Sequence, residues 1–87
     1  MGKQHTTGEV AEAIGATEQT VRRWTKLGLL PTPERVHRGG RGVTSLYPGH
    51  TLAQARWVLD QLENENLPIP RVLAALQAGA FKPPEEP

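Results

Sequence analysis

Four long polar side chains recur on one face of a short helical pattern between residues 17 and 27. They lie at i, i+3, i+4 and i+7: Gln19, Arg22, Arg23 and Lys26. Guanidinium and ammonium groups donate hydrogen bonds, and one arginine can donate two hydrogen bonds to the edge of a guanine base. This face is therefore suited to holding a polyanion through its phosphates and base edges.

The positive charge is concentrated in the middle of the chain. Residues 19–41 contain six Arg and Lys residues and one acid, whereas residues 48–87 contain three Arg and Lys residues and five acids. The net charge over all 87 residues is only +1. This asymmetry favours a molecule in which one face meets a polyanion. An ordinary solvated charged face remains the alternative at this point.

The residue types that catalysis or metal binding needs are absent or badly spaced. With no cysteine, the chain can form no disulfide, thiolate metal site or cysteine nucleophile. His5, His37 and His50 have neither metal-ligand spacing nor a triad partner, and the glycine-rich loop lacks the G-K-[ST] ending of a phosphate-binding loop. We expect no enzyme, no metal and no cofactor. No apolar stretch approaches the ~20 residues of a membrane span, so we expect a cytoplasmic protein with no membrane partner.

Two short helices must position the polar face. The sequence Thr6-Thr7-Gly8-Glu9 has the form of a capping box and predicts a first helix from about Thr7 to Ile14, ended by Gly15. Thr17 is expected to cap a second helix that ends at Gly28. The inward residues of this second helix are expected to be Val21, Trp24 and Leu27.

The spacing of these two helices is typical of a helix-turn-helix. Ala11 supplies a small residue where the helices cross, Gly15 can take positive φ at the turn, and Val21 closes the packing. Any αα-hairpin can meet this spacing by chance, but the cationic face favours the DNA-binding form, in which the second helix enters the major groove. A surface helix with solvated arginines is the alternative.

The rest of the chain predicts a wing and a second helix pair. Residues 34–46 contain three glycines between short β-favouring pieces, as in a hairpin or a flexible loop. Helices are expected at about 51–64, with Leu52, Ala55, Leu59 and Leu62 on one face, and after Pro68, with Pro70 in the first turn. The predicted fold is mostly α: a winged helix-turn-helix with about four helices and a short β-hairpin wing, spanning residues 1–79. Residues 80–87 are expected to form a flexible Pro/Glu tail.

Residues 5–77 resemble the N-terminal winged helix-turn-helix domain of MerR-family transcription regulators, a domain seen also in phage excisionases and small terminase subunits. The resemblance is carried by TTGEVAEAIGATEQTVRRWTKLGLLP, by the tyrosine of SLYP and by TLAQARWVLDQLENENLPIPRVLAAL. It implies that Arg22 and Arg23 contact DNA from the recognition helix and that the loop from Arg35 to Arg41 is the wing. Tyr47 stands where the family has an aromatic residue that closes the wing, in a region that often contacts a phosphate.

The combined interpretation is a small sequence-specific binder of double-stranded DNA, acting as a transcriptional regulator. Its expected recognition-helix contacts are Thr17, Gln19, Thr20, Arg22, Arg23 and Lys26. Its expected wing contacts are Arg35, His37, Arg38, Arg41 and Tyr47. The alternatives are a phage-type architectural protein, such as an excisionase or terminase small subunit, and a protein-interaction adaptor that uses Trp57, Phe81 and the acidic tail.

The chain departs from the larger relatives in two respects. Its wing, GGRGVTSLY, is longer than the usual one, and no long coiled-coil helix or effector domain follows. We therefore expect no small-molecule effector. A homodimer or a tandem arrangement on DNA would have to use another surface. Trp57 falls off the apolar stripe of its helix and is either an interface residue or a packed cover for the wing.

Overall fold

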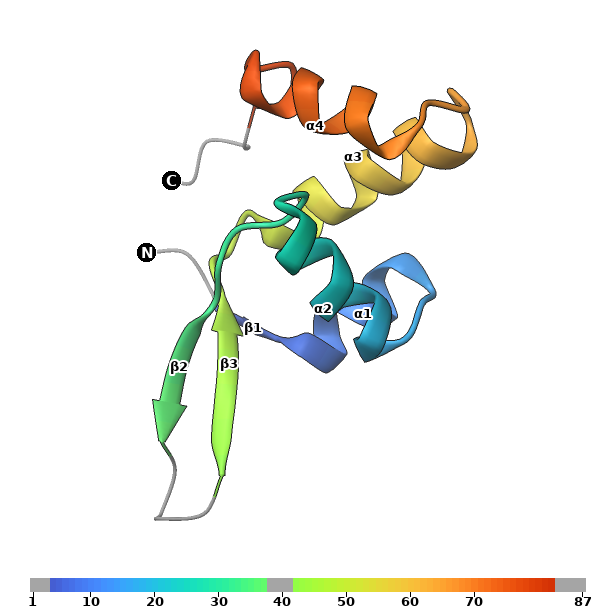
Figure 1. Ribbon diagram of the computed structural model, residues 1–87. Coiled ribbons are helices and arrows are strands. Elements are labelled where there is room, and N and C mark those ends of the chain that lie inside the picture. Colours follow the sequence, from blue (N-terminus) through green and yellow to red (C-terminus); the bar gives the residue numbers. More distant parts are fainter. Residues whose placement is uncertain (1–3, 38–41, 83–87) are drawn as a thin grey trace.

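The computed structural model of this chain describes residues 4–37 and 42–82. Within these ranges the chain forms four helices and one small antiparallel sheet (Figure 1), which confirms the predicted winged helix-turn-helix architecture. The elements in chain order are β1 (His5–Thr6), α1 (Thr7–Ile14), α2 (Glu18–Leu27), β2 (Glu34–His37), β3 (Val43–Tyr47), α3 (Thr51–Glu63) and α4 (Ile69–Gln77).

Side-chain caps fix where α1 begins, as the sequence predicts. The Thr6 hydroxyl accepts a hydrogen bond from the Glu9 backbone N–H at 3.2 Å, and the Glu9 carboxylate accepts one from the Thr6 N–H at 2.8 Å. The capping box therefore satisfies two amide donors that the helix itself leaves without partners. Gly15, at φ 65°, ends α1 in the left-handed conformation.

A threonine cap and a glycine likewise fix the two ends of α2. The Thr17 hydroxyl accepts a hydrogen bond from the Thr20 N–H at 3.2 Å, and Gly28 ends the helix at φ 89°. At that end the Leu29 N–H donates to the Trp24 carbonyl at 2.9 Å, which turns the chain back towards the core. Both ends of α2 therefore lie where the sequence predicts them.

One hydrophobic core lies beneath the helix-turn-helix and extends to α3 and α4. Val10, Ala11 and Ile14 of α1 meet Val21 and Trp24 of α2 there, and all five are buried. The remaining buried apolar residues come from the turn after α2, from β3 and from the last two helices: Leu29, Leu30, Tyr47, Ala55, Val58 and Val72. Leu29 and Leu30, just after α2, are therefore part of this core.

The prediction that Leu27 faces inward is wrong, because this side chain is 38% exposed. A step of three residues along an α-helix turns the side chain by about 300°, so Leu27 lies about 120° away from the direction of Val21. The i, i+3, i+6 series therefore drifts off the buried face. Leu29, two residues later, is fully buried.

The buried face of α3 also differs from the predicted one. Thr51, Ala55 and Val58 are fully buried at i, i+4 and i+7, while Leu52, Leu59 and Leu62 are only partly buried. Helix α3 packs against α1 on one side and α4 on the other. Because the apolar stripe is shared between two neighbours, its centre lies to one side of the leucines.

The three strands form a sheet in the order β1-β3-β2, with both pairs antiparallel. The β2–β3 hairpin extends away from the helices in Figure 1, and α4 lies at the opposite end of the molecule. Strand β1 was not predicted. It consists of His5 and Thr6 paired with Tyr47 and Leu46, so it ties the start of α1 to the base of the hairpin.

The C-terminal end of the described chain packs against α3. The rings of Trp57 and Phe81 lie 5.8 Å apart with an interplanar angle of 51°, and both side chains are partly buried. Such tilted pairs are favourable aromatic geometries. Packing therefore reaches Phe81, two residues beyond the boundary expected from the sequence. Residues 83–87, the greater part of the expected tail, lie outside the described residues.

The end of α2 provides a test of the fold. A Gly28→Ala variant places a side chain at φ 89° and within 3.5 Å of the Leu73 side chain, and we expect it to lower the free energy of unfolding by about 1–2 kcal/mol. Gly8→Ala is the matched control, because Gly8 lies inside α1 without positive φ and a methyl group there makes only ordinary contacts. Urea unfolding measures both. A Gly28→Ala variant as stable as the parent protein would contradict this account of the helix end.

Candidate nucleic-acid interface

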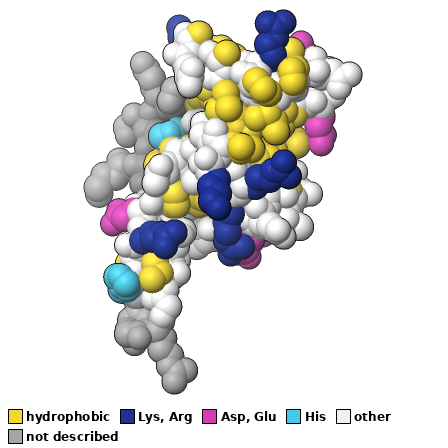
Figure 2. Space-filling view, viewed as in Figure 1, with side chains coloured by type: hydrophobic (Ala, Val, Ile, Leu, Met, Phe, Trp, Pro, Cys, Tyr) yellow, Lys and Arg dark blue, Asp and Glu magenta, His cyan; other side chains and the backbone are white. Residues whose placement is uncertain are grey.

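The exposed face of α2 presents the predicted polar side chains to solvent. Gln19, Arg22, Arg23 and Lys26 are all exposed, while Val21 and Trp24 on the other side of the helix are buried. Figure 2 shows Lys and Arg side chains gathered on this face of the molecule, with a further one on the hairpin. The apolar side of α2 therefore packs on the core, and its basic side chains lie in solvent.

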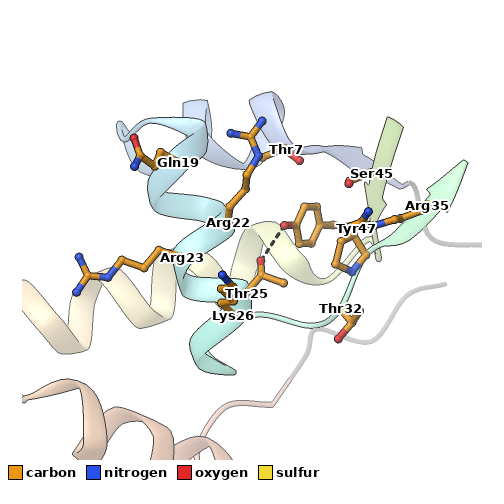
Figure 3. Close-up of a pocket in the computed structure, with 11 residues that line it drawn as sticks. Thr7, Gln19, Arg22, Arg23, Thr25, Lys26, Thr32, Arg35, Ser45 and Tyr47 are labelled. Carbon is orange, nitrogen blue, oxygen red and sulfur yellow. Dashed lines mark hydrogen bonds between the residues drawn. The ribbon is translucent and has the colours of Figure 1, made fainter. Parts of the chain in front are cut away.

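The two adjacent arginines point in different directions (Figure 3). Arg22 rises along α2 towards Thr7, at the start of α1, and Arg23 extends away from the hairpin. Arg22 also forms an ion pair with Glu18, one helical turn earlier, with Nη2 and Oε1 3.2 Å apart. Arg22 thus lies on the side of α2 that faces the wing, a distinction that adjacency in the sequence does not reveal.

An open groove of about 730 Å³ lies between α2 and the hairpin. Three of its basic side chains come from α2 and one, Arg35, comes from β2. Its lining also includes hydroxyl groups from α1, from α2, from the connection after α2 and from β3. The full set is Thr7, Gln19, Arg22, Arg23, Thr25, Lys26, Thr32, Pro33, Arg35, Ser45 and Tyr47. No carboxylate belongs to this described lining. The groove can therefore accept an extended anion along its length.

A second hollow of about 420 Å³ continues from the groove towards the start of α1. Arg22, Arg35, Thr7 and Ser45 line both spaces, and Glu18 lines only the second. Arg35 lies opposite Ser45 in the β2–β3 register, so the hairpin presents a cation beside a hydroxyl group. These shared residues join the two spaces into one continuous concave surface.

Tyr47 joins α2 to the wing from inside the core. Its side chain is 2% exposed, and its hydroxyl oxygen lies 2.7 Å from the Thr25 hydroxyl. The Thr25 hydroxyl donates its single hydrogen to the Val21 carbonyl at 2.8 Å. Tyr47 must then be the donor to Thr25, and its own hydrogen is not available for a phosphate. The ring of Tyr47 sets the distance between α2 and β3.

The remaining predicted contact residues lie at the start of α2, at the end of β2 or outside the described residues. The hydroxyl groups of Thr17 and Thr20 lie 3.2 Å apart at the start of α2, where Thr17 also caps the helix. His37 is exposed at the end of β2 and lines neither hollow. Arg38 and Arg41, the other two predicted wing cations, lie outside the described residues.

Sequence reasoning missed the hydroxyl residues of the groove: Thr7, Thr25, Thr32 and Ser45. One of them could have been found, because Ser45 lies two residues before Tyr47 on a strand, where alternate side chains share a face. The threonines carry no comparable signal. Thr25 lies inside α2 and Thr32 between two prolines, and only the fold brings them to the groove.

Two other classes of site find no support in the part of the chain that the structure describes. No group of three or more His, Asp or Glu residues among residues 4–37 and 42–82 is arranged to hold a metal ion. Over the same ranges no helix has the length and apolar character required to cross a bilayer.

Comparison with known proteins agrees with this geometry. Residues 6–41 match the family model described as MerR family regulatory protein. The match spans α1, α2 and the first strand of the wing, and it confirms the MerR-like character of the helix-turn-helix. A match of this kind implies a DNA-binding regulatory role. Neither the comparison with curated proteins nor that with solved structures finds a match.

The hydroxyl pair between Tyr47 and Thr25 can be tested by a double-mutant cycle on stability. Tyr47→Phe keeps the ring in the core but removes the hydrogen bond, and Thr25→Val removes the other partner at similar volume. We expect a coupling free energy of about 0.5–1.5 kcal/mol between the two changes, since the pair is one partly buried hydrogen bond. Urea unfolding of both single variants and the double variant measures it. Strictly additive losses would show that the two hydroxyl groups do not depend on each other.

Proposed function

We propose that this protein binds specific sequences of double-stranded DNA and regulates transcription. The observation that carries the proposal is the groove between α2 and the wing, where four basic side chains from two elements face one concave surface. An α-helix of this size fits the major groove of B-DNA, which is about 12 Å wide. In DNA-binding helix-turn-helix proteins the second helix lies in the major groove, and α2 is the second helix of this motif.

The residues of α2 divide into two roles. Arg22 and Gln19 stand where the helix would meet base edges, at its N-terminal half, which is the part that reads bases in this motif. Arg23 and Lys26 stand further along and outward, where phosphates would lie. Thr17 and Thr20, at the helix start, would add hydroxyl contacts to the same strand.

The wing supplies the second contact. Arg35 faces the groove beside Ser45, and both would meet the phosphate backbone next to the major groove. His37 lies at the end of β2. The wing cations expected from the sequence, Arg38 and Arg41, would favour the negative potential of a narrow minor groove. Tyr47 has a structural role in this interface, because its hydroxyl group donates its hydrogen to Thr25 and so links the wing to α2.

The adaptor alternative is weakened by the packing of its aromatic residues. Trp57 and Phe81 contact each other and are partly buried, which leaves less aromatic surface for a protein partner. An architectural role in excision or DNA packaging would use the same DNA contacts as a regulator. Footprinting at promoters and at recombination or packaging sites would separate these two uses of one interface.

Selection of bound duplexes from a random pool is the primary experiment. We expect an enriched motif that occurs as paired or tandem sites, because one small domain makes few base contacts. The spacing between the sites would report whether two copies bind symmetrically or in tandem. Recovery of random sequences with weak binding, together with tight capture of a protein, would instead favour the adaptor.

Arginine substitutions on α2 should reduce specific binding. Arg22→Ala and Arg23→Ala are each expected to lower affinity for the selected site by about 1–3 kcal/mol without unfolding the domain. Arg71→Ala is the matched control, since Arg71 is exposed on α4 and lines neither hollow. Titrations with labelled duplex give the affinities, and circular dichroism checks the fold. Equal affinities for all three variants would remove α2 from the interface.

Lys26→Ala and Arg35→Ala should change the salt dependence of binding. Each is expected to reduce the slope of log K against log salt concentration by about 0.9, because the variant neutralises one phosphate fewer than the parent protein. Arg71→Ala should leave the slope unchanged. A slope that stays the same in Arg35→Ala would show that β2 does not touch the backbone.

Removal of the aromatic pair should leave DNA binding intact. Phe81→Ala is expected to expose Trp57 and increase its quenching by acrylamide, while affinity for the selected duplex stays within about twofold of the parent value. The same change in a Trp57→Phe background identifies which tryptophan responds, because Trp24 is buried elsewhere. A large loss of DNA affinity in Phe81→Ala would link the C-terminal segment to the interface.

A further inference from the structure

An acidic side chain lies among the cations of the candidate interface. Glu18 is in the first turn of α2 and forms the 3.2 Å ion pair with Arg22. The Arg22 and Glu18 side chains are 65% and 53% exposed respectively, so the pair is surrounded by solvent. A pair of this kind adds little stability to a protein. Its position on the surface that would meet DNA makes it relevant to binding instead.

The Glu18 carboxylate lies close to α1 as well as to Arg22. Its carboxylate oxygen Oε2 would lie 3.5 Å from a methyl group built on Gly8, so it rests over the first turn of α1. It also lines the smaller hollow together with Arg22 and Arg35. The carboxylate therefore stands between the α2 face and the wing, where a DNA phosphate would otherwise approach Arg22.

Two physical effects follow from this position. A carboxylate beside Arg22 repels phosphate from that guanidinium group, and the amide groups at the start of a helix, which attract anions, already have a negative neighbour. The guanidinium carries five N–H donors, and the bond to Glu18 uses one on Nη2. The four that remain include enough for the two parallel bonds that a guanine edge accepts.

We propose that Glu18 is a positioning residue that determines specificity: it keeps Arg22 away from backbone phosphates and directs it to base edges. This inference rests on the proposed function, since it assigns a role within the same interface. Glu18 lowers affinity for unrelated DNA more than affinity for the correct site. The groove thus separates its cations into those that bind any duplex and one that is reserved for reading.

The test compares Glu18→Gln with Glu12→Gln. Both changes remove one negative charge, and Glu12 is exposed on α1 and lines neither hollow. Affinities are measured for the selected duplex and for an unrelated duplex of equal length over a series of salt concentrations. For Glu18→Gln we expect the ratio of the two affinities to fall at least about fivefold, and the salt slope on the unrelated duplex to steepen by about 0.9, the value for one additional neutralised phosphate. Glu12→Gln should keep the ratio within about twofold.

The same comparison in an Arg22→Ala background shows whether Glu18 acts through Arg22. There Glu18→Gln should no longer change the ratio. Equal increases on both duplexes in Glu18→Gln, with an unchanged slope, would reduce the effect to net charge and overturn the inference. A lowered ratio that persists without Arg22 would overturn it as well. If the unaltered protein itself shows no preference between duplexes, the proposed function fails instead. Circular dichroism confirms that each variant is folded.

Discussion

The hydrogen bond between Tyr47 and Thr25 is the constraint on which the geometry of the concave surface depends. It joins β3 to the last turn of α2, and the Thr25 hydroxyl in turn donates a hydrogen bond to the Val21 carbonyl. Because the Tyr47 ring is buried in the core, the hairpin cannot shift relative to α2 without breaking core packing. The distance between Arg22 on the helix and Arg35 on the wing is therefore a property of the interior, although both side chains are in solvent. Packing and hydrogen bonds behind a binding surface hold its side chains in their relative positions.

The helix-turn-helix itself is stabilised by short-range interactions that need no large core. A capping box at Thr6 and Glu9, a threonine cap at Thr17 and left-handed glycines at positions 15 and 28 fix both ends of α1 and α2. These devices satisfy the backbone groups that helix ends leave without partners. Residues such as Val10, Val21 and Trp24 then have only to pack two prearranged helices together. The outer faces of the helices are left for charge, and the exposed face of α2 includes one acid, Glu18, paired with Arg22.

The prediction succeeded where residues act on close neighbours in the chain. Thr6 caps a helix that begins at the next residue, and Gly28 ends one at the residue before it, so the bounds of α1 and α2 followed from local chemistry. It failed where several faces compete for the same apolar residues. Leu27 is exposed because it lies about 120° around α2 from Val21, whereas Leu29, after the turn, is fully buried. The buried face of α3 is centred on Thr51, Ala55 and Val58 and not on the predicted leucines, since α3 packs against both α1 and α4.

The sequence by itself determined the type of fold, the polar face of α2 and the presence of a hairpin with cations. Helical periodicity, capping residues and charge distribution can all be identified from residues close together in the chain. Only the tertiary structure decided that Arg22 faces the wing while Arg23 turns away, and that Thr7, Thr25 and Ser45 share one groove. It also decided that Tyr47 serves as an internal link and that Trp57 packs on Phe81. These outcomes depend on contacts between residues about twenty or more positions apart. Their pairing follows from how α2, the hairpin and α3 pack together, and no local pattern encodes that packing.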